Sequence, residues 1–279
     1  MDWSNIREGE LKEIFDALEE AFAFAEVDYY IIGALAKDIW YAKGDIVSRQ
    51  TKDVDFAVLA GSPEKYQTIR NYLKEKKNFT NAATNAFVML SPSGIQVDIL
   101  PFGEIEIDNS VTFASEGLNN IKVNGFMEVY NSGIQAMELK TGHQFRIATL
   151  PSIILLKLIA YDDRPERRMK DAVDIADIIH YFFDIQPTLI YSEEHLDLFR
   201  GDIEDKSLQE ISATVIGREI RKIISSNTSL TERVKQILQG HIEREEKSPF
   251  VRIMTTQTGA TVGHTVSQLK NILSGITAQ

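Results

Sequence analysis

The chain has 279 residues, and its 41 Asp and Glu against 30 Lys and Arg give a formal net charge of −11 at pH 7. This length fits one large domain or two small ones, and a hydrophobic content of 43% is enough for a folded core. The absence of cysteine excludes a disulfide scaffold, a thiolate metal site and a cysteine nucleophile. The negative charge is unfavourable for an extended nucleic-acid-binding surface, because such surfaces neutralise phosphates with Lys and Arg.

Export and membrane signals are missing from the sequence. The first residues include acidic side chains and no apolar signal-peptide core. The longest apolar stretch, 153–161, is interrupted by Lys157 and is far shorter than the roughly 20 residues that span a bilayer. The five histidines form no HxxxH or HxH pair that would indicate a zinc site. We therefore expect a cytoplasmic protein that does not contact a membrane.

The hydrophobic pattern of the first half of the chain predicts alternating helices and strands. Helices are expected at 5–26, 34–41 and 63–77. Strands are expected at 28–32, 53–59, 87–90 and 95–100, the last two joined as a hairpin. Further short strands are expected at 104–107, 121–130, 134–138 and 144–148.

Strand patterns are absent from the sequence after residue 150. Helices are expected there at 151–162, 168–183, 206–225, 229–245 and 263–277. The change predicts an α/β domain over 1–150 and a helical domain over 151–279. The fold class is therefore α+β, with an N-terminal mixed sheet and flanking helices followed by a C-terminal helical domain.

A pair of acids two residues apart lies on the strand expected at 53–59. Side chains alternate along a strand, so Asp53 and Asp55 project from one face while Val54 and Phe56 enter the core. Two parallel carboxylates on a rigid strand suit Mg²⁺, which prefers oxygen ligands and keeps waters for substrate phosphates. Such a pair arises by chance about once in a chain with this Asp content, so the pair alone is a weak signal.

Two neighbouring features strengthen the interpretation. Gly33 lies where a strand passes into a helix, and the first N–H groups of that helix can bind a phosphate. The alternative is that Gly33 only makes a tight turn. Asp98 shares a strand face with Gln96 in an apolar segment, where a carboxylate needs a metal or a counter-ion. An ion pair with Arg49 or Lys52 is the structural alternative.

Three segments together resemble the polymerase-β-type nucleotidyltransferase superfamily, and within it the AbiEii-like group, several members of which are toxins of toxin–antitoxin pairs. They are Ile31–Ala34, Arg49–Ala57 and Val97–Gly103, and the likeness covers roughly residues 28–180. The resemblance implies a nucleotidyltransferase-like sheet, two Mg²⁺ ions with Mn²⁺ as a substitute, and an NTP substrate. It implies that the catalytic and metal-binding residues are Asp53, Asp55 and Asp98. It implies that the nucleotide-binding residues are Gly33, Ala34, Arg49, Thr51, Lys157, Asp171 and Asp174.

One of these assignments departs from the family's pattern, and another has a structural alternative. Ala34 stands where the family usually has Ser or Gly, which removes a hydroxyl contact to phosphate and keeps the backbone N–H. Lys157 interrupts an apolar helix face, where a buried ammonium needs a partner such as a phosphate or an Asp. Extension of Lys157 to the surface, or an ordinary ion pair with a neighbouring acid, is the structural alternative.

The expected function is Mg²⁺-dependent transfer of NMP from an NTP such as ATP to an acceptor hydroxyl. A tRNA end, a protein side chain and a small molecule are all compatible acceptors. The resemblance also suggests a toxin of a toxin–antitoxin or phage-defence system, with an antitoxin protein as partner. The alternative is a catalytically inert binding or regulatory module of the same fold. Retention of all three acids argues against it, because carboxylates that hold no cation repel one another.

Overall fold

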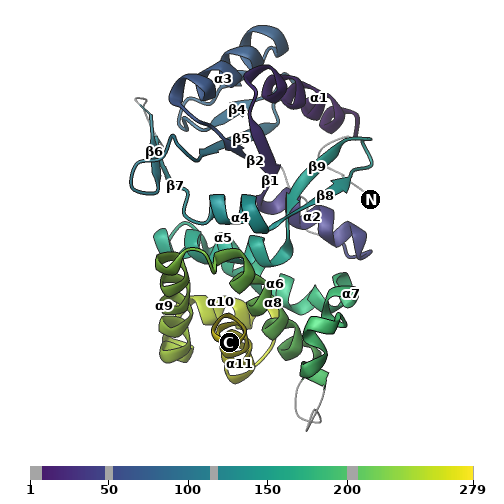
Figure 1. The fold of residues 1–279 in the computed structure, drawn as a ribbon, viewed down its shortest axis with the longest axis vertical. Coiled ribbons are helices and arrows are strands. Elements are labelled where there is room, and N and C mark those ends of the chain that lie inside the picture. Colours follow the sequence, from purple (N-terminus) through teal and green to yellow (C-terminus); the bar gives the residue numbers. More distant parts are fainter. Residues whose placement is uncertain (1–7, 48–52, 114–118, 200–206, 279) are drawn as a thin grey trace. The chain divides into compact units, whose positions relative to one another are not determined.

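The computed structural model describes residues 8–47, 53–113, 119–199 and 207–278 (Figure 1). The chain divides into two compact units. The first comprises Met1–Tyr130 and Ile134–Thr149, and the second comprises Asn131–Gly133 and Leu150–Gln279.

The described part of the first unit is built on a seven-stranded mixed sheet with the order β3-β4-β5-β2-β1-β9-β8. Its strands are β1 (Asp28–Ile31), β2 (Asp53–Leu59), β3 (Thr80–Asn81), β4 (Val88–Leu90), β5 (Gln96–Phe102), β8 (Ile134–Glu138) and β9 (Gln144–Ala148). The central strand β2 runs parallel to β5 and antiparallel to β1, and β1 runs parallel to β9. The predicted mixed sheet is thereby confirmed.

Helices α1 (Glu8–Ala25) and α3 (Pro63–Lys77) pack against each other and cover one face of this sheet (Figure 1). The rings of Phe15 and Phe22 on α1 contact Phe56 of β2, with centroids 6.3 and 5.6 Å apart. From α3, the Tyr66 hydroxyl donates a hydrogen bond to the Ile99 carbonyl of β5 at 2.8 Å. Aromatic pairs of this kind contribute large buried areas. A large part of the core of this unit therefore lies on the face to which Phe56 points.

Helix α2 (Gly33–Lys43) follows β1 directly. The indole of Trp40 is 1% exposed and donates to the Ala148 carbonyl at 2.9 Å, which ties the C-terminal half of α2 to the end of β9. The start of α2 at residue 33 agrees with the helix predicted from 34 onwards. The first turn of α2 follows the end of β1 and lies against Asp55 of β2.

Two of the predicted strands are wrong. Residues 104–107 form no strand, because Gly103 adopts a φ of +96° and the chain turns, with the Glu106 N–H donating to the Gly103 carbonyl at 2.9 Å. The strand predicted at 121–130 ends early. Strand β7 (Asn120–Lys122) pairs with β6 (Ser110–Thr112), and α4 (Phe126–Ser132) then begins after Gly125 with a φ of +88°. Left-handed backbone at these glycines is incompatible with a continuing strand.

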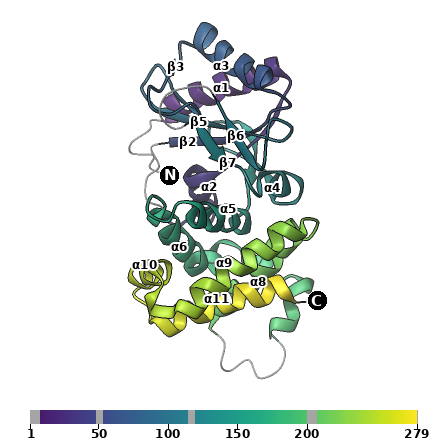
Figure 2. The same cartoon turned by 90° about the vertical axis from the view of Figure 1, so that its left-hand side faces the viewer.

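The described residues of the second unit that lie after 149 form helices and no strand. The helices are α5 (Leu150–Asp163), α6 (Met169–Ile185), α7 (Pro187–Ile190), α8 (Leu208–Ile224), α9 (Thr228–Arg244), α10 (Pro249–Thr258) and α11 (Val262–Thr277), with 3₁₀ turns η1 (Glu193–Phe199) and η3 (Glu245–Lys247). Helices α8 and α11 lie alongside each other (Figure 2). The predicted C-terminal helical region is confirmed, and α10 was not predicted.

Across the described ranges, no helix has both the length and the apolar character to cross a membrane.

Candidate active site

The three predicted acids of the first unit lie on one face of the two central strands. In the parallel pairing of β2 with β5, Asp55 is directly opposite Asp98, and Asp53 is opposite Gln96. Neighbouring strands are about 4.8 Å apart, so two opposite carboxylates can share a cation. The intervening Val54 and Val97 are 0% exposed, whereas Asp53 is exposed and Asp55 and Asp98 are half-buried. The alternation predicted from the sequence is confirmed.

Gly33 brings the start of α2 against the carboxylate of Asp55. Its φ is +68°, and a Cβ placed on it would lie 2.3 Å from the Asp55 Oδ2. The Ile32 N–H donates to the Asp55 carbonyl at 3.0 Å, which fixes the same approach through the backbone. Gly33 is therefore required both by its backbone angle and by the closeness of Asp55. Beside it Ala34 is half-buried in the first turn of α2.

Gln96 orients Asp98 from the same strand face. Its Nε2 donates a hydrogen bond to Asp98 Oδ1 at 2.8 Å. A side-chain amide that holds one carboxylate oxygen fixes the direction of the other. The shared face that the sequence predicted for Gln96 and Asp98 is thus a direct contact.

The chemistry of this face fits divalent metal binding. Asp53, Asp55 and Asp98 offer only oxygen donors, which hard cations such as Mg²⁺ prefer. The glycine at position 33 leaves room beside the Asp55 carboxylate that a side chain would fill. Arg49, Thr51 and Lys52 lie outside the described residues.

The nucleotide-binding residues predicted in the second unit, Lys157, Asp171 and Asp174, contact one another. Lys157 Nζ donates to Asp171 Oδ1 and to Asp174 Oδ2, each at 2.8 Å, and all three side chains are largely buried. Burial lowers the pKa of Lys157, but the charges of Asp171 and Asp174 outweigh it and raise the pKa above its ordinary value. Lys157 is therefore a charged, paired ammonium in a low-dielectric setting.

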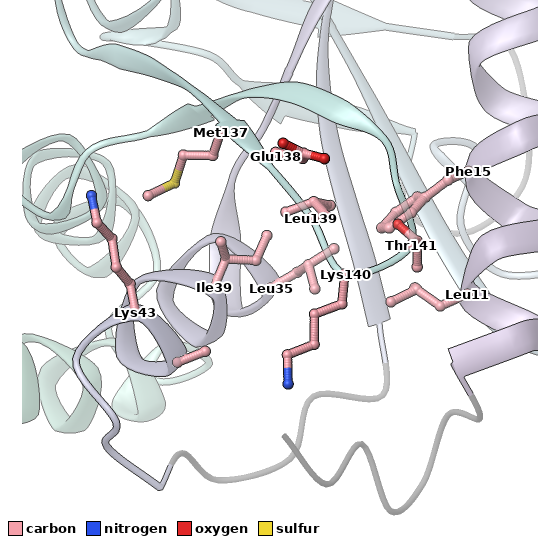
Figure 3. Close-up of a pocket in the computed structure, with 11 residues that line it drawn as sticks. Leu11, Phe15, Leu35, Ile39, Lys43, Met137, Glu138, Leu139, Lys140 and Thr141 are labelled. Carbon is pink, nitrogen blue, oxygen red and sulfur yellow. The ribbon is translucent and has the colours of Figure 1, made fainter.

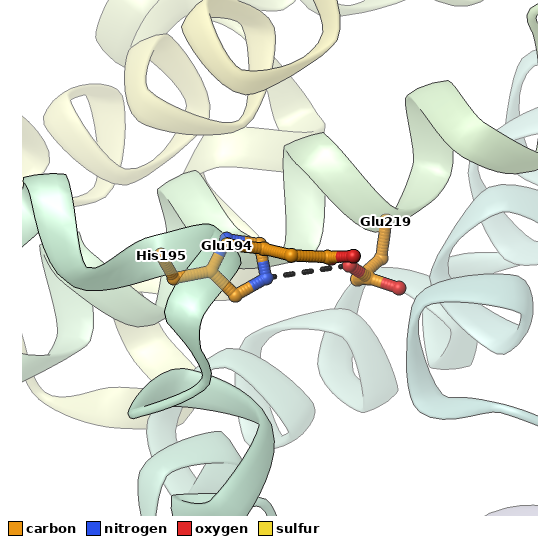
Figure 4. Close-up of side chains that lie close together, drawn as sticks. All are labelled: Glu194, His195 and Glu219. Carbon is orange, nitrogen blue, oxygen red and sulfur yellow. Dashed lines mark ion pairs between the residues drawn. The ribbon is translucent and has the colours of Figure 1, made fainter.

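A further acidic cluster in the second unit was not predicted from the sequence (Figure 4). One ligand atom each from Glu194, His195 and Glu219 lies within 4.8 Å of the others. His195 is 1% exposed, and its Nε2 is 3.3 Å from Glu219 Oε1 without forming a hydrogen bond. Residues 194 and 219 are too far apart in the sequence for any spacing to signal the cluster.

The partners of this cluster identify it as an ion-pair network. The Lys222 ammonium donates to Glu194 and, at 2.7 Å, to Glu219 Oε1, so it already supplies the cation that the carboxylates need. Arg218 Nη1 lies 3.4 Å from His195 Nδ1 and can only donate to it. The proton of a neutral His195 is then on Nε2, the nitrogen that a metal would need. The network therefore requires no metal.

Comparison with known proteins gives the class and then the family. The mixed sheet sets three strand carboxylates beside a helix that begins with glycine. The family model described as "Nucleotidyl transferase AbiEii toxin, Type IV TA system" matches residues 16–248. The chain belongs to this family of nucleotidyltransferases. Among curated protein sequences, none matches it.

Solved structures with a similar fold are distant. A nucleotidyltransferase-like protein from Paracoccidioides brasiliensis is 13% identical with a TM-score of 0.43, over 82% of this chain and 94% of that chain. The lincosamide antibiotic adenylyltransferase LnuA with bound lincomycin is 18% identical with a TM-score of 0.35, over 55% and 86%. ANT(2")-Ia in complex with adenylyl-2"-tobramycin is 11% identical with a TM-score of 0.36, over 84% and 98%. At these scores the likeness carries no argument about substrate.

Proposed function

We propose that the chain transfers NMP from an NTP to an acceptor hydroxyl at the carboxylate face of β2 and β5. The observation that carries this proposal is the register that sets Asp98 opposite Asp55, with Gly33 against the Asp55 carboxylate. Asp53, Asp55 and Asp98 would hold two Mg²⁺ ions, for which Mn²⁺ is a substitute. When bound, such ions neutralise phosphate charge and polarise the reacting oxygens.

The first turn of α2 is the proposed phosphate-binding element. Its N-cap residue Ile32 makes no side-chain cap, and no acidic residue lies in the first turn. The N–H groups of Gly33 and Ala34 lie at the N-terminal end of α2, and this end of a helix attracts anions. Ala34 contributes its backbone N–H and no hydroxyl. The terminal phosphates of the NTP would lie here.

The proposed transfer is an in-line displacement at the α-phosphorus. The acceptor oxygen forms a bond to the α-phosphorus, the bond from that atom to the bridging oxygen of the β-phosphate breaks, and pyrophosphate leaves. Asp98, held by Gln96, is the proposed base that takes the proton of the acceptor hydroxyl. The reaction depends mainly on positioning and charge neutralisation.

Lys157, Asp171 and Asp174, together with Arg49 and Thr51, are proposed to complete nucleotide binding. The two aspartates already bond to the Lys157 ammonium, and Arg168 Nη1 lies 3.8 Å from Asp171 Oδ2. A phosphate that bound Lys157 would have to displace one of the aspartates, so we assign this group a smaller share of the nucleotide affinity than the first turn of α2.

The proposed biological partner follows from the family and not from the geometry. We propose a toxin whose activity is countered by an antitoxin protein. A tRNA end, a protein hydroxyl and a small-molecule hydroxyl are all chemically suitable acceptors. The net charge of −11 disfavours acceptors that require an extended basic surface.

The direct test is labelled NMP transfer. Purified protein is incubated with each α-³²P-labelled NTP, Mg²⁺ and three acceptor classes: total tRNA, a protein extract and aminoglycosides. Labelling is expected for the native chain and not for Asp55→Asn. Asp108→Asn is the matched control, because Asp108 is exposed in a turn with a φ of +50°, which Asn also accepts. Equal labelling by the native chain and Asp55→Asn would contradict the assignment.

A further inference from the structure

A pocket of about 270 Å³ opens in the first unit between α1, α2 and the turn that joins β8 to β9 (Figure 3). Its walls are mainly apolar, with Leu11, Phe15, Leu35, Ile39, Met137 and Leu139. None of the proposed catalytic carboxylates lines it. Phe15 is fully buried and packs edge-on against Phe56 and Phe145, so one wall is a rigid part of the core.

Two ammonium groups lie at the rim of this apolar pocket. Figure 3 shows Lys43 and Lys140 extending on either side of Ile39. Glu138 is the one carboxylate among the lining residues, so the rim carries a net positive charge in a chain whose net charge is −11. Lys43 Nζ lies 5.3 Å over the ring of Trp40, which restricts its position.

The rim charges are not neutralised locally. Among the described residues, neither Lys43 nor Lys140 forms an ion pair, and Glu138 forms none with either lysine. Lys12 of α1, Lys122 and the lysines of α3 do not line the pocket. An anionic group at the rim would therefore gain two attractions without breaking an existing ion pair.

We propose that the pocket binds a small amphipathic carboxylate, with an alkyl or aryl body in the apolar interior and its carboxylate at the rim lysines. Apolar walls with a few placed charges are the usual composition of a small-molecule site. A partner helix would require a long groove for anchors spaced over two turns, whereas this pocket is compact. The proposal does not depend on nucleotidyl transfer.

The test compares ligands that share one body and differ in head group. The full chain, labelled at its Ile δ1 and Met ε methyl groups, is titrated with octanoate, octan-1-ol and octylammonium at constant ionic strength. Octanoate is expected to shift the Ile39 and Met137 resonances saturably and to bind more tightly than the other two. The Lys43→Gln and Lys140→Gln variants should each weaken octanoate by about two- to fivefold and leave octan-1-ol unchanged. Lys74→Gln, an exposed lysine on α3, is the matched control.

A second set of variants fills the pocket. Ala42 lines it from α2 and is half-buried, so Ala42→Phe should abolish the octanoate shifts at Ile39. Leu139→Trp blocks the same space from the hairpin turn and replaces Ala42→Phe if that variant does not fold. Octylammonium that binds as tightly as octanoate, or octanoate shifts that persist in a folded pocket-filling variant, would overturn the proposal.

Discussion

At the residue scale, Gly33 and the Asp55 carboxylate leave no space for a side chain between them. The left-handed φ of +68° and the 2.3 Å separation of a hypothetical Cβ from Asp55 Oδ2 are independent reasons for glycine. This close approach joins the proposed phosphate-binding turn of α2 to a proposed metal ligand. Displacing either partner should therefore disturb both functions.

Gly33→Ala is expected to abolish NMP transfer and to lower the free energy of unfolding by about 1–2 kcal/mol, because Ala is strained at positive φ. The control is Gly94→Ala, where φ is +82° and no atom lies within 4 Å of an added Cβ. Gly94→Ala should lose similar stability in urea titrations and keep full transfer. If Gly33→Ala also keeps full transfer, the contact is not needed for activity.

The individual acids were only partly predictable. The common face of Asp53 and Asp55 follows from strand alternation and was confirmed. The position of Asp98 opposite Asp55 depends on the register of two strands that α3, β3 and β4 separate in the chain, and no local pattern encodes it. Lys157 illustrates the same limit. The sequence left a phosphate, an ion pair and the surface open, and the structure shows the ion pair with Asp171 and Asp174.

At the scale of elements, strong periodicity was the dependable signal. The ends of α5, α6, α9 and α11 lie within two residues of the prediction, because α6, α9 and α11 each carry an apolar stripe and α5 is an almost continuous apolar segment. The strand predicted at 121–130 was wrong because Gly125 ends the extended segment, and α10 was missed because its ten residues give too short a pattern. The backbone conformation of one glycine explains the first error, and the shortness of the helix explains the second.

The packing of α8 against α11 sets a strict steric limit on Gly217 and Gly275. A Cβ on Gly217 would lie 2.1 Å from the Ile272 carbonyl oxygen, which is backbone and cannot rotate away. We expect Gly217→Ala to lower the free energy of unfolding by about 3 kcal/mol through overpacking. Gly240→Ala, on α9, meets only the end of the Arg244 side chain at 3.5 Å and should be neutral or stabilising. Equal stability of the two variants in thermal or urea unfolding would contradict this packing.

His241, at the end of α9, should make the protein less stable in acid. Burial, with the nearby charge of Arg244, lowers the pKa of His241 to about 4, against the opposing effect of Asp162. Because the folded-state pKa is depressed, its contribution is full above the unfolded-state pKa of about 6.5 and is lost as the pH falls towards 4. The loss should reach about 2–3 kcal/mol.

Urea unfolding at pH 7 and at pH 4.5 measures this effect. His241→Gln, which can keep the contact that His241 Nδ1 makes with Ser248 Oγ at 3.0 Å, should lose less stability between the two pH values than the native chain. His180→Gln, an exposed histidine on α6, is the control. An unchanged pH dependence in His241→Gln would show that other groups are responsible.

At the scale of the whole molecule, part of the acidic charge is concentrated at the proposed site. Three of the 41 acids lie together on one face of β2 and β5, where cations would lower their mutual repulsion. Composition could exclude thiol chemistry and disfavour an extended nucleic-acid surface, but it could not indicate transfer chemistry. That interpretation came from the order of motifs along the chain, and the family match over residues 16–248 confirmed the class.

The central claim is that these three acids form a divalent-metal site that works with an NTP. Calorimetric titration of Mn²⁺ into the chain, with a non-hydrolysable NTP analogue present, tests it most directly. The account predicts saturable Mn²⁺ binding that Asp55→Asn and Asp98→Asn each abolish and that Asp108→Asn retains. No Mn²⁺ binding by the native chain, with or without the analogue, or binding that survives both site variants, would contradict it.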